Sequence, residues 1–394
     1  MGEIISWKYA MPYLIVFFIL LYIALLKDRF FKGKLIPSLK VVSIFLFIFL
    51  GFRGYIYSDW TSYLILFKKI PDIYTFVTVD LEDVEDFFAI EYGYLFYMSL
   101  VKTICDSFDF FVVISSLIDI VVLYMVFKKY LPDNPYWGIA LFIVFGGLSF
   151  EFNLYRNVKG VMLFLLSLKY IENKSPVRYF AVNCLGCLFH ISSVIYLPLY
   201  YIFNKKFSKQ FYLTIFIVIN LVYLLQIPVC KSMLLLFAEF VEGRAARNIL
   251  YYFENLPEAY GFSFAYIERF ITGALLVKYY DRIIAENRLS FIFVNMYMLY
   301  FGIYAMCWDI AVFSSRGSML FIMSYWFIIP YILKSINRRI TYNIILLFFV
   351  LVCTMKIYLN NNNIMARYDN ILFGASSMEE RERIMNKTFE IINH

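Results

Sequence analysis

The sequence predicts an all-α protein that crosses a lipid bilayer many times, and its composition and apolar runs both indicate this. Hydrophobic residues make up 62% of the 394-residue chain and charged residues only 16%, whereas a soluble domain carries roughly a quarter charged residues. Only helices and closed barrels satisfy the backbone within lipid. The apolar runs are too long and too uniformly apolar for the alternating strands of a barrel, so they predict helices.

The apolar runs also set the expected number of membrane crossings. A crossing helix needs about 20 mostly apolar residues, and several runs reach that length once their flanks are counted. The runs that are almost free of charge cover 11–26, 41–52, 110–127, 179–203, 211–227, 291–307 and 340–352. We expect about ten to twelve crossings in one transmembrane domain, 1–358, followed by a short external tail, 359–394.

The distribution of positive charge predicts which loops face the cytoplasm. The net charge of +7 is typical of a membrane protein with basic cytoplasmic loops, and we do not attribute it to nucleic-acid binding. The external loops are then 53–91, which is rich in acidic residues, and 228–261. The basic stretches that predict cytoplasmic loops are 27–40, 204–210, 278–288 and 334–339.

The middle of the chain does not fit a simple count of crossings. The stretches 128–129 and 174–178 are both basic, yet alternating crossings place both of them outside. In one alternative, 91–104 does not cross fully. In the other, 179–203 is a broken, re-entrant pair with its apex near His190, which lipid permits where the broken backbone lines a cavity.

Two local patterns carry separate predictions. Ser377-x-x-Glu380 is a capping box, which predicts a short charged helix in the tail. Cys184 and Cys187 form a C-x-x-C inside an apolar stretch without a second pair, so we interpret them as packing residues. Because the chain has only two histidines, we expect neither a metal site nor a cofactor.

Charged residues within or beside apolar runs are costly unless they are paired or functional. Arginine binds phosphate in a bidentate fork, so several arginines near embedded polar groups favour an anionic ligand. Simpler explanations stay open: Arg53 as a lipid headgroup anchor, Arg316 in a salt bridge with Asp309, and His190 as a packing residue. The charged residues and the histidine that we select within or beside apolar runs are Arg53, Asp59, Glu91, Arg156, Lys159, His190 and Arg316.

Short motifs in a fixed order add a resemblance to a known family. Asp59 and Tyr63 stand at i and i+4, on one face of an expected interfacial helix. The further motifs are Arg53, Glu91-x-Gly-Tyr94, Tyr155-Arg156, Phe189-His190-x-Ser192, Arg316 and Arg367-Tyr368. In this order the chain resembles the EpsG family of Wzy-type polymerases of O-antigen, capsular or exopolysaccharide, best over 53–201. Asn157 and Tyr92 replace the family's usual Gln and Pro, and neither change removes a charge.

The resemblance implies a GT-C-type glycosyltransferase in a bacterial cytoplasmic membrane. Such an enzyme moves a growing glycan from undecaprenyl pyrophosphate onto the non-reducing end of a lipid-linked repeat unit at the outer face. Besides the lipid-linked oligosaccharide and the bilayer, the implied partners are a chain-length regulator and a flippase of the same pathway.

The reaction assigns a hypothetical role to each candidate residue. For the base that takes the acceptor's proton we favour Asp59 or His190, with Glu91 next. Fixed positive charge stabilises the pyrophosphate leaving group without a metal, and we assign this role to Arg156 and Arg316, with Arg53 third. The remaining candidates for substrate binding are Tyr63, Tyr94, Lys159 and Tyr368.

Two other functions remain open. A flippase or transporter of lipid-linked oligosaccharide would place functional charges near the membrane midplane on several helices, whereas here they gather on the predicted outer side. A transferase similar to an O-antigen ligase would share the pyrophosphate site and differ in its acceptor.

Overall fold

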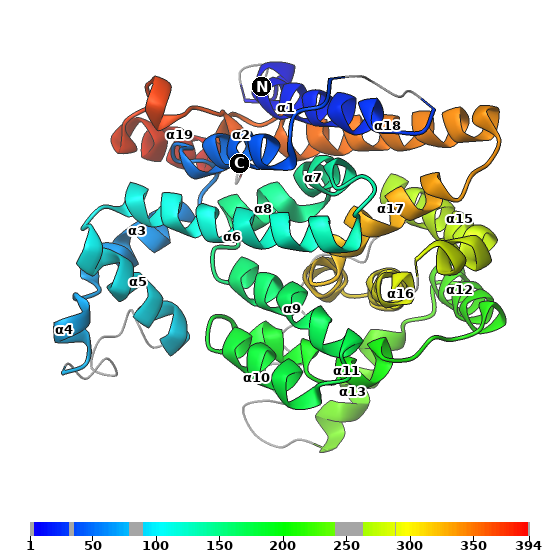
Figure 1. Ribbon diagram of the computed structural model, residues 1–394. Helices are drawn as coiled ribbons and strands as arrows, with labels where there is room; N and C mark the ends of the chain where they lie inside the picture. The colour runs from blue at the N-terminus through cyan, green and yellow to red at the C-terminus, as the bar shows by residue number, and fades with distance from the viewer. Residues whose placement is uncertain (1–3, 31–34, 79–89, 241–262, 288, 393–394) are drawn as a thin grey trace. The chain divides into compact units, whose positions relative to one another are not determined.

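The computed structural model describes residues 4–30, 35–78, 90–240, 263–287 and 289–392. Within these ranges the regular structure is helical, and backbone pairing of the β type is confined to isolated bridges. The prediction of an all-α membrane protein is therefore confirmed. The chain forms two compact units, which we call unit 1 (1–201 with 349–394) and unit 2 (202–348) (Figure 1).

The helices follow one another along the chain with short connections. Those wholly within unit 1 are α1 (Trp7–Leu26), α2 (Leu39–Gly51), α3 (Trp60–Lys69), α4 (Ile73–Phe76), α5 (Tyr92–Ile104), α6 (Phe108–Tyr130), α7 (Tyr136–Phe142), η3 (Ile143–Gly147), α8 (Leu148–Phe152), α9 (Asn157–Glu172), α10 (Pro176–Cys187), η4 (Ile191–Tyr196), η7 (Ile364–Ala366), η8 (Ile371–Phe373) and α19 (Met378–Ile392). Those wholly within unit 2 are α12 (Lys209–Leu224), α13 (Val229–Phe240), α15 (Phe264–Glu286), α16 (Ser290–Met306), η5 (Phe313–Gly317), η6 (Ile322–Ser324) and α17 (Tyr325–Lys334). The boundaries between the units fall within α11 (Leu199–Phe203) and α18 (Arg339–Asn361).

Among the described residues, α1, α6 and α18 are long and apolar enough to cross a membrane. The pair formed by α12 and the start of α13, bent by 86°, gives a fourth if it counts as one span. Large apolar side chains remain exposed on these helices, such as Phe18, Ile118 and Leu351, and exposed apolar surface of this kind suits contact with lipid. Shorter apolar helices cover Leu39–Gly51, Tyr136–Phe152, Ser290–Met306 and Ile322–Lys334. The count of about ten to twelve crossings stays a prediction.

The break expected near His190 is present. Helix α10 ends at Cys187 and η4 begins at Ile191, and the chain turns back so that the Tyr179 hydroxyl donates to the Tyr196 carbonyl at 2.6 Å. Gly160 lets η4 pack closely against α9, since a Cβ there would stand 2.1 Å from the Ser193 hydroxyl. We call α10, the turn at His190 and η4 the hairpin. Helix α5, which opens the other ambiguous stretch, has only 13 residues, fewer than a full crossing needs.

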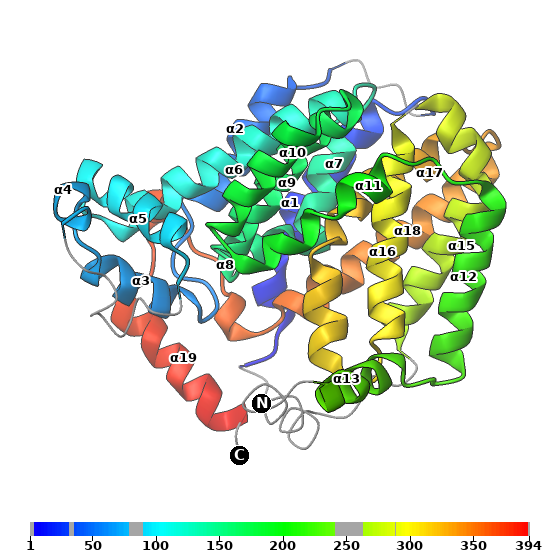
Figure 2. The same ribbon diagram turned by 90° about the horizontal axis from the view of Figure 1, so that it is seen from below.

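The C-terminal tail folds back onto the loop that follows α2. The Gly54 amide donates to the Asp369 carbonyl at 3.0 Å, and the Ile371 amide donates to the Phe52 carbonyl at 2.8 Å. The tail ends in α19, whose first turn has the predicted cap, because the Glu380 amide donates to the Ser377 hydroxyl at 3.2 Å. Tail and loop thus meet within unit 1, and the side of the membrane on which they lie stays a prediction. Figure 2 shows α19 running away from the neighbourhood of α3.

Unit 2 packs its helices through hydrogen bonds between buried tyrosine and asparagine side chains. The Tyr212 hydroxyl on α12 donates to Asn295 Oδ1 on α16 at 2.6 Å. The Tyr266 hydroxyl on α15 donates to Asn220 Oδ1 on α12 at 2.7 Å. Paired polar groups of this kind hold apolar helices together without leaving an unsatisfied atom in the interior.

Replacing Gly54 by alanine tests the contact between loop and tail. The added Cβ would lie 2.0 Å from Asp369 Oδ1, so we expect Gly54→Ala to lower the free energy of unfolding by about 1–3 kcal/mol. Gly302→Ala is the matched control, because its Cβ would meet Ile219 Cδ1 at an ordinary 3.5 Å within a helix. Thermal unfolding of the detergent-solubilised protein measures both, and equal stability of the two variants would contradict the expectation.

Candidate functional site

A cavity of about 440 Å³ opens in unit 1 beside α3. Its polar wall contains Asp59, Ser62, Tyr63 and Arg156, and its apolar wall contains Ile65, Leu66 and Ile90. The predicted face of α3 is confirmed, since Asp59 stands at the N-cap and the Tyr63 amide donates to the Asp59 carbonyl at 3.3 Å. Three residues predicted from sequence, Asp59, Tyr63 and Arg156, thus meet at one cavity.

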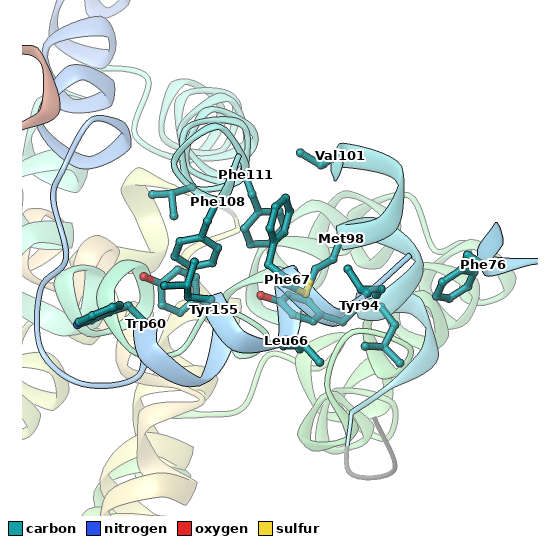
Figure 3. Packing of buried hydrophobic residues seen from close by; sticks show 14 residues of the cluster. Trp60, Leu66, Phe67, Phe76, Tyr94, Met98, Val101, Phe108, Phe111 and Tyr155 are labelled. Carbon is teal, nitrogen blue, oxygen red and sulfur yellow. The ribbon is translucent and has the colours of Figure 1, made fainter. Parts of the chain in front are cut away.

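An apolar cluster that shares Leu66 with the cavity wall holds α3 in place. Helix α3 has 10 residues and is too short to be stable alone, so its orientation depends on packing. Trp60 and Phe67 on α3 pack with Met98 on α5 and Phe108 on α6 (Figure 3). Tyr94, a predicted substrate ligand, is 0% exposed within this cluster and its ring packs against Tyr63.

Arg156 joins the cavity to the apex of the hairpin. Its Nη1 donates to Glu91 Oε2 at 2.5 Å, and its Nε donates to the Tyr63 hydroxyl at 3.4 Å. The second oxygen of Glu91 accepts the Ile191 amide at 2.8 Å. Burial raises the pKa of Tyr63, and the neighbouring Arg156 opposes this increase. Glu91 therefore holds the arginine and the hairpin together at the edge of the cavity.

His190 lies at the apex of the hairpin, outside the helices long enough to cross a membrane. Its Nδ1 accepts the Ser192 amide at 3.1 Å and lies 2.7 Å from the Ser192 hydroxyl. Burial lowers the pKa of His190, while Glu91 raises it and Arg156 lowers it further. Because a backbone N–H always donates, Nδ1 is unprotonated and Nε2 carries the proton of the neutral ring.

Arg53 lies in a buried network and is not among the residues that line the cavity. It is 4% exposed, and its guanidinium donates to the Leu50 carbonyl at 2.6 Å, to the Ser116 hydroxyl at 2.9 Å and to the Glu151 carbonyl. The Glu151 carboxylate lies 3.7 Å from Arg53 and accepts the Ser116 hydroxyl at 2.8 Å. The ring of Tyr155 also faces the Arg53 guanidinium, with its centroid at 5.6 Å. Arg53 thus binds the segment that leads into Arg156.

Lys159, one turn beyond Arg156, is engaged in a second buried pair. Its Nζ donates to Asp119 Oδ2 at 2.5 Å and to the Ser115 carbonyl at 2.9 Å. Lys159 is 6% exposed and Asp119 1%. This pair joins α9 to α6. Lys159 is therefore held by protein groups, and it is not among the residues that line the cavity.

The remaining candidates lie elsewhere. The Tyr368 hydroxyl donates to the Phe49 carbonyl at 2.9 Å, and its ring stacks on Phe49 in the contact between tail and loop. Arg316 belongs to η5 in unit 2, where its side chain is exposed. Its place in the site stays a prediction.

Two acidic residues of the buried networks were not among the predicted candidates. Asp119 stands inside the apolar run 110–127, and Glu151 stands four residues before the motif Tyr155-Arg156. Each carboxylate keeps one oxygen without a hydrogen-bond partner. The signal was present, because an acid inside an apolar run requires a cation, and Lys159 and Arg53 are those cations.

Separating the partners of the Lys159–Asp119 pair tests its role. Asp119→Asn leaves the ammonium buried without its carboxylate, so we expect a loss of about 3–5 kcal/mol in the free energy of unfolding. The double variant Asp119→Leu with Lys159→Met removes both charges, and most of that loss should be recovered. Unfolding curves of the purified variants measure both, and a double variant as unstable as the single one would refute an ion-pair origin.

A comparison with protein families identifies one family. The model of the EpsG family matches residues 38–371, which include every residue of the cavity wall. No curated protein and no solved structure matches the chain. The family consists of membrane proteins similar to Wzy-type exopolysaccharide polymerases. Since the match spans most of the sequence, the chain belongs to the EpsG family.

Proposed function

We propose that the protein is a polysaccharide polymerase that transfers a growing glycan from undecaprenyl pyrophosphate to the non-reducing end of a lipid-linked repeat unit. The reaction would occur at the outer face of a bacterial cytoplasmic membrane. The observation that carries the proposal is one cavity with a carboxylate, a guanidinium and an apolar wall, in a member of the EpsG family. These groups correspond to a base, a leaving-group stabiliser and a surface for lipid.

Arg156 is the cation on the cavity wall that suits the pyrophosphate. A guanidinium has five N–H donors, so Arg156 can hold Glu91 and a phosphate oxygen at once. Its position is fixed before substrate arrives by Glu91 and Tyr63, and preorganised charge of this kind lowers the barrier. In this proposal the fixed positive charge comes from arginine and not from a metal ion.

Asp59 is the best candidate for the base. The acceptor hydroxyl attacks the anomeric carbon and passes its proton to the carboxylate, while the bond to the pyrophosphate oxygen breaks and its electron pair leaves with the pyrophosphate. Glu91 is less suitable, because its two oxygens already accept from Arg156 and the Ile191 amide. His190 is less suitable because its neutral ring accepts at Nδ1 and carries its proton at Nε2.

The apolar wall of the cavity is a binding surface for the hydrocarbon chain of the lipid carrier. Ile65, Leu66 and Ile90 line the cavity together with the polar residues, so the first isoprene units of the carrier can bind there while the pyrophosphate reaches Arg156. Arg53 and Lys159 then act as positioning residues, since both are buried in ion pairs on either side of Arg156.

Removing Arg156 should abolish most of the transfer. We expect Arg156→Ala to reduce the rate by about a hundredfold or more, and Arg156→Lys to recover only part of it because the fork is lost. Arg178→Ala, which removes an exposed arginine on α10, is the control and should leave the rate unchanged. Arg316→Ala tests the second predicted cation. Polymer yield in a complementation assay measures all four, and near-normal polymer from Arg156→Ala would refute the assignment.

The choice of base predicts a distinct pH dependence. Because the pKa of His190 lies below its ordinary 6.5, the ring is already neutral at pH 7 and gains a proton only as the pH falls through that lowered value. If Asp59 is the base, His190→Gln should keep the acid-side inflection of the rate, whereas Asp59→Asn should lose about 10²–10⁴ in rate. Disappearance of the inflection in His190→Gln alone would instead identify the histidine as the base.

Incubating purified protein with a lipid-linked repeat unit tests the reaction class. A polymerase gives a ladder of products on a gel. Unchanged substrate that nevertheless exchanges between the leaflets of vesicles would identify a flippase, and transfer only to a different lipid acceptor would identify a ligase.

A further inference from the structure

Two cysteines of unit 2 lie side by side at the ends of different helices. Cys230 is the second residue of α13, and Cys307 is the C-cap of α16. The two thiols lie close enough to interact with each other, and both are free and partly buried. They are 77 positions apart in the sequence, so only the fold brings them together.

Hydrogen bonds on either side of the two cysteines fix this contact. The Lys231 amide donates to Asp309 Oδ2 at 2.7 Å, and the Trp308 indole donates to the Ile227 carbonyl at 2.9 Å. The start of α13 is therefore clamped to the residues that follow α16. A fixed backbone keeps the thiols in contact, which a disulfide requires because its two Cα atoms must lie within about 7 Å.

Chain direction places both cysteines at the same end of unit 2. Helix α12 begins at the end of the basic stretch 204–210, and α16 begins after the basic stretch 278–288. Tyr212 and Asn295, near the starts of these helices, are hydrogen-bonded, so the two helices run side by side in the same direction. Cys230 and Cys307 follow their far ends. With the basic ends in the cytoplasm, the cysteines face the exterior, where disulfides form and persist.

We propose that Cys230 and Cys307 form a disulfide that ties α13 to the end of α16 at the outer face. Each thiol loses a proton, and the pair passes two electrons to the disulfide of a thiol–disulfide oxidant, which is reduced to two thiols. The new bond closes the long chain segment that contains α15. The proposal is independent of the transfer chemistry in unit 1.

Peptide mapping of the wild-type protein tests the bond directly. The protein is purified without reductant, treated with oxidised glutathione, alkylated with N-ethylmaleimide under denaturing conditions and digested. We expect a linked peptide that contains Cys230 and Cys307 and that separates on reduction. Recovery of both cysteines as alkylated free thiols, or in links to other cysteines, would overturn the proposal. Because no variant is needed, the result does not depend on a substitution that fails to fold.

Variants then relate the bond to stability. Reduction should lower the melting temperature of the wild type by roughly 5 °C, and it should have no effect on Cys230→Ser or Cys307→Ser. The control is the double variant Cys184→Ser with Cys187→Ser, which removes the two cysteines of α10 and should respond to reduction as the wild type does. A response that persists in Cys230→Ser would assign the effect to another pair.

Discussion

The candidate site depends on the ion pair between Arg156 and Glu91. This single contact, at 2.5 Å, joins the start of α9 to the start of α5, and the same carboxylate holds the hairpin apex through the Ile191 amide. Three segments that are distant in sequence therefore meet at one group. An ion pair with both side chains about one-fifth exposed, at 20% and 17%, keeps most of its attraction while one side stays open to a ligand.

Two buried ion pairs, Arg53–Glu151 and Lys159–Asp119, fix the position of Arg156. Arg53 donates a hydrogen bond to the segment before Arg156, and Lys159, one turn after Arg156, is paired with Asp119. In apolar surroundings a lone charge is very unfavourable, so each pair has one favourable arrangement and little freedom to shift. Glu151 and Asp119 thus fix the backbone on both sides of Arg156, although neither lines the cavity.

Sequence reasoning predicted the parts of the site that follow local rules. The i, i+4 spacing placed Asp59 and Tyr63 on one face, and the charge count around 179–203 led to the break at His190. It could not predict that Tyr94 points into the apolar cluster or that Arg53 is enclosed, because side-chain direction is decided by packing between distant segments. The contact between Gly54 and Asp369 could not be predicted from the sequence either, since isolated backbone bridges leave no periodic pattern.

The charge balance of the cavity shows what the proposed reaction would still require. Among the described residues of the cavity wall, Arg156 is the cation, and it faces Glu91 while Asp59 adds a further negative charge. Arg156 alone therefore cannot neutralise a pyrophosphate, whose charge grows as the glycosyl bond breaks. The proposed reaction would therefore need a second source of positive charge. Lys159 and Arg53 cannot serve, because moving either would leave a buried carboxylate unpaired.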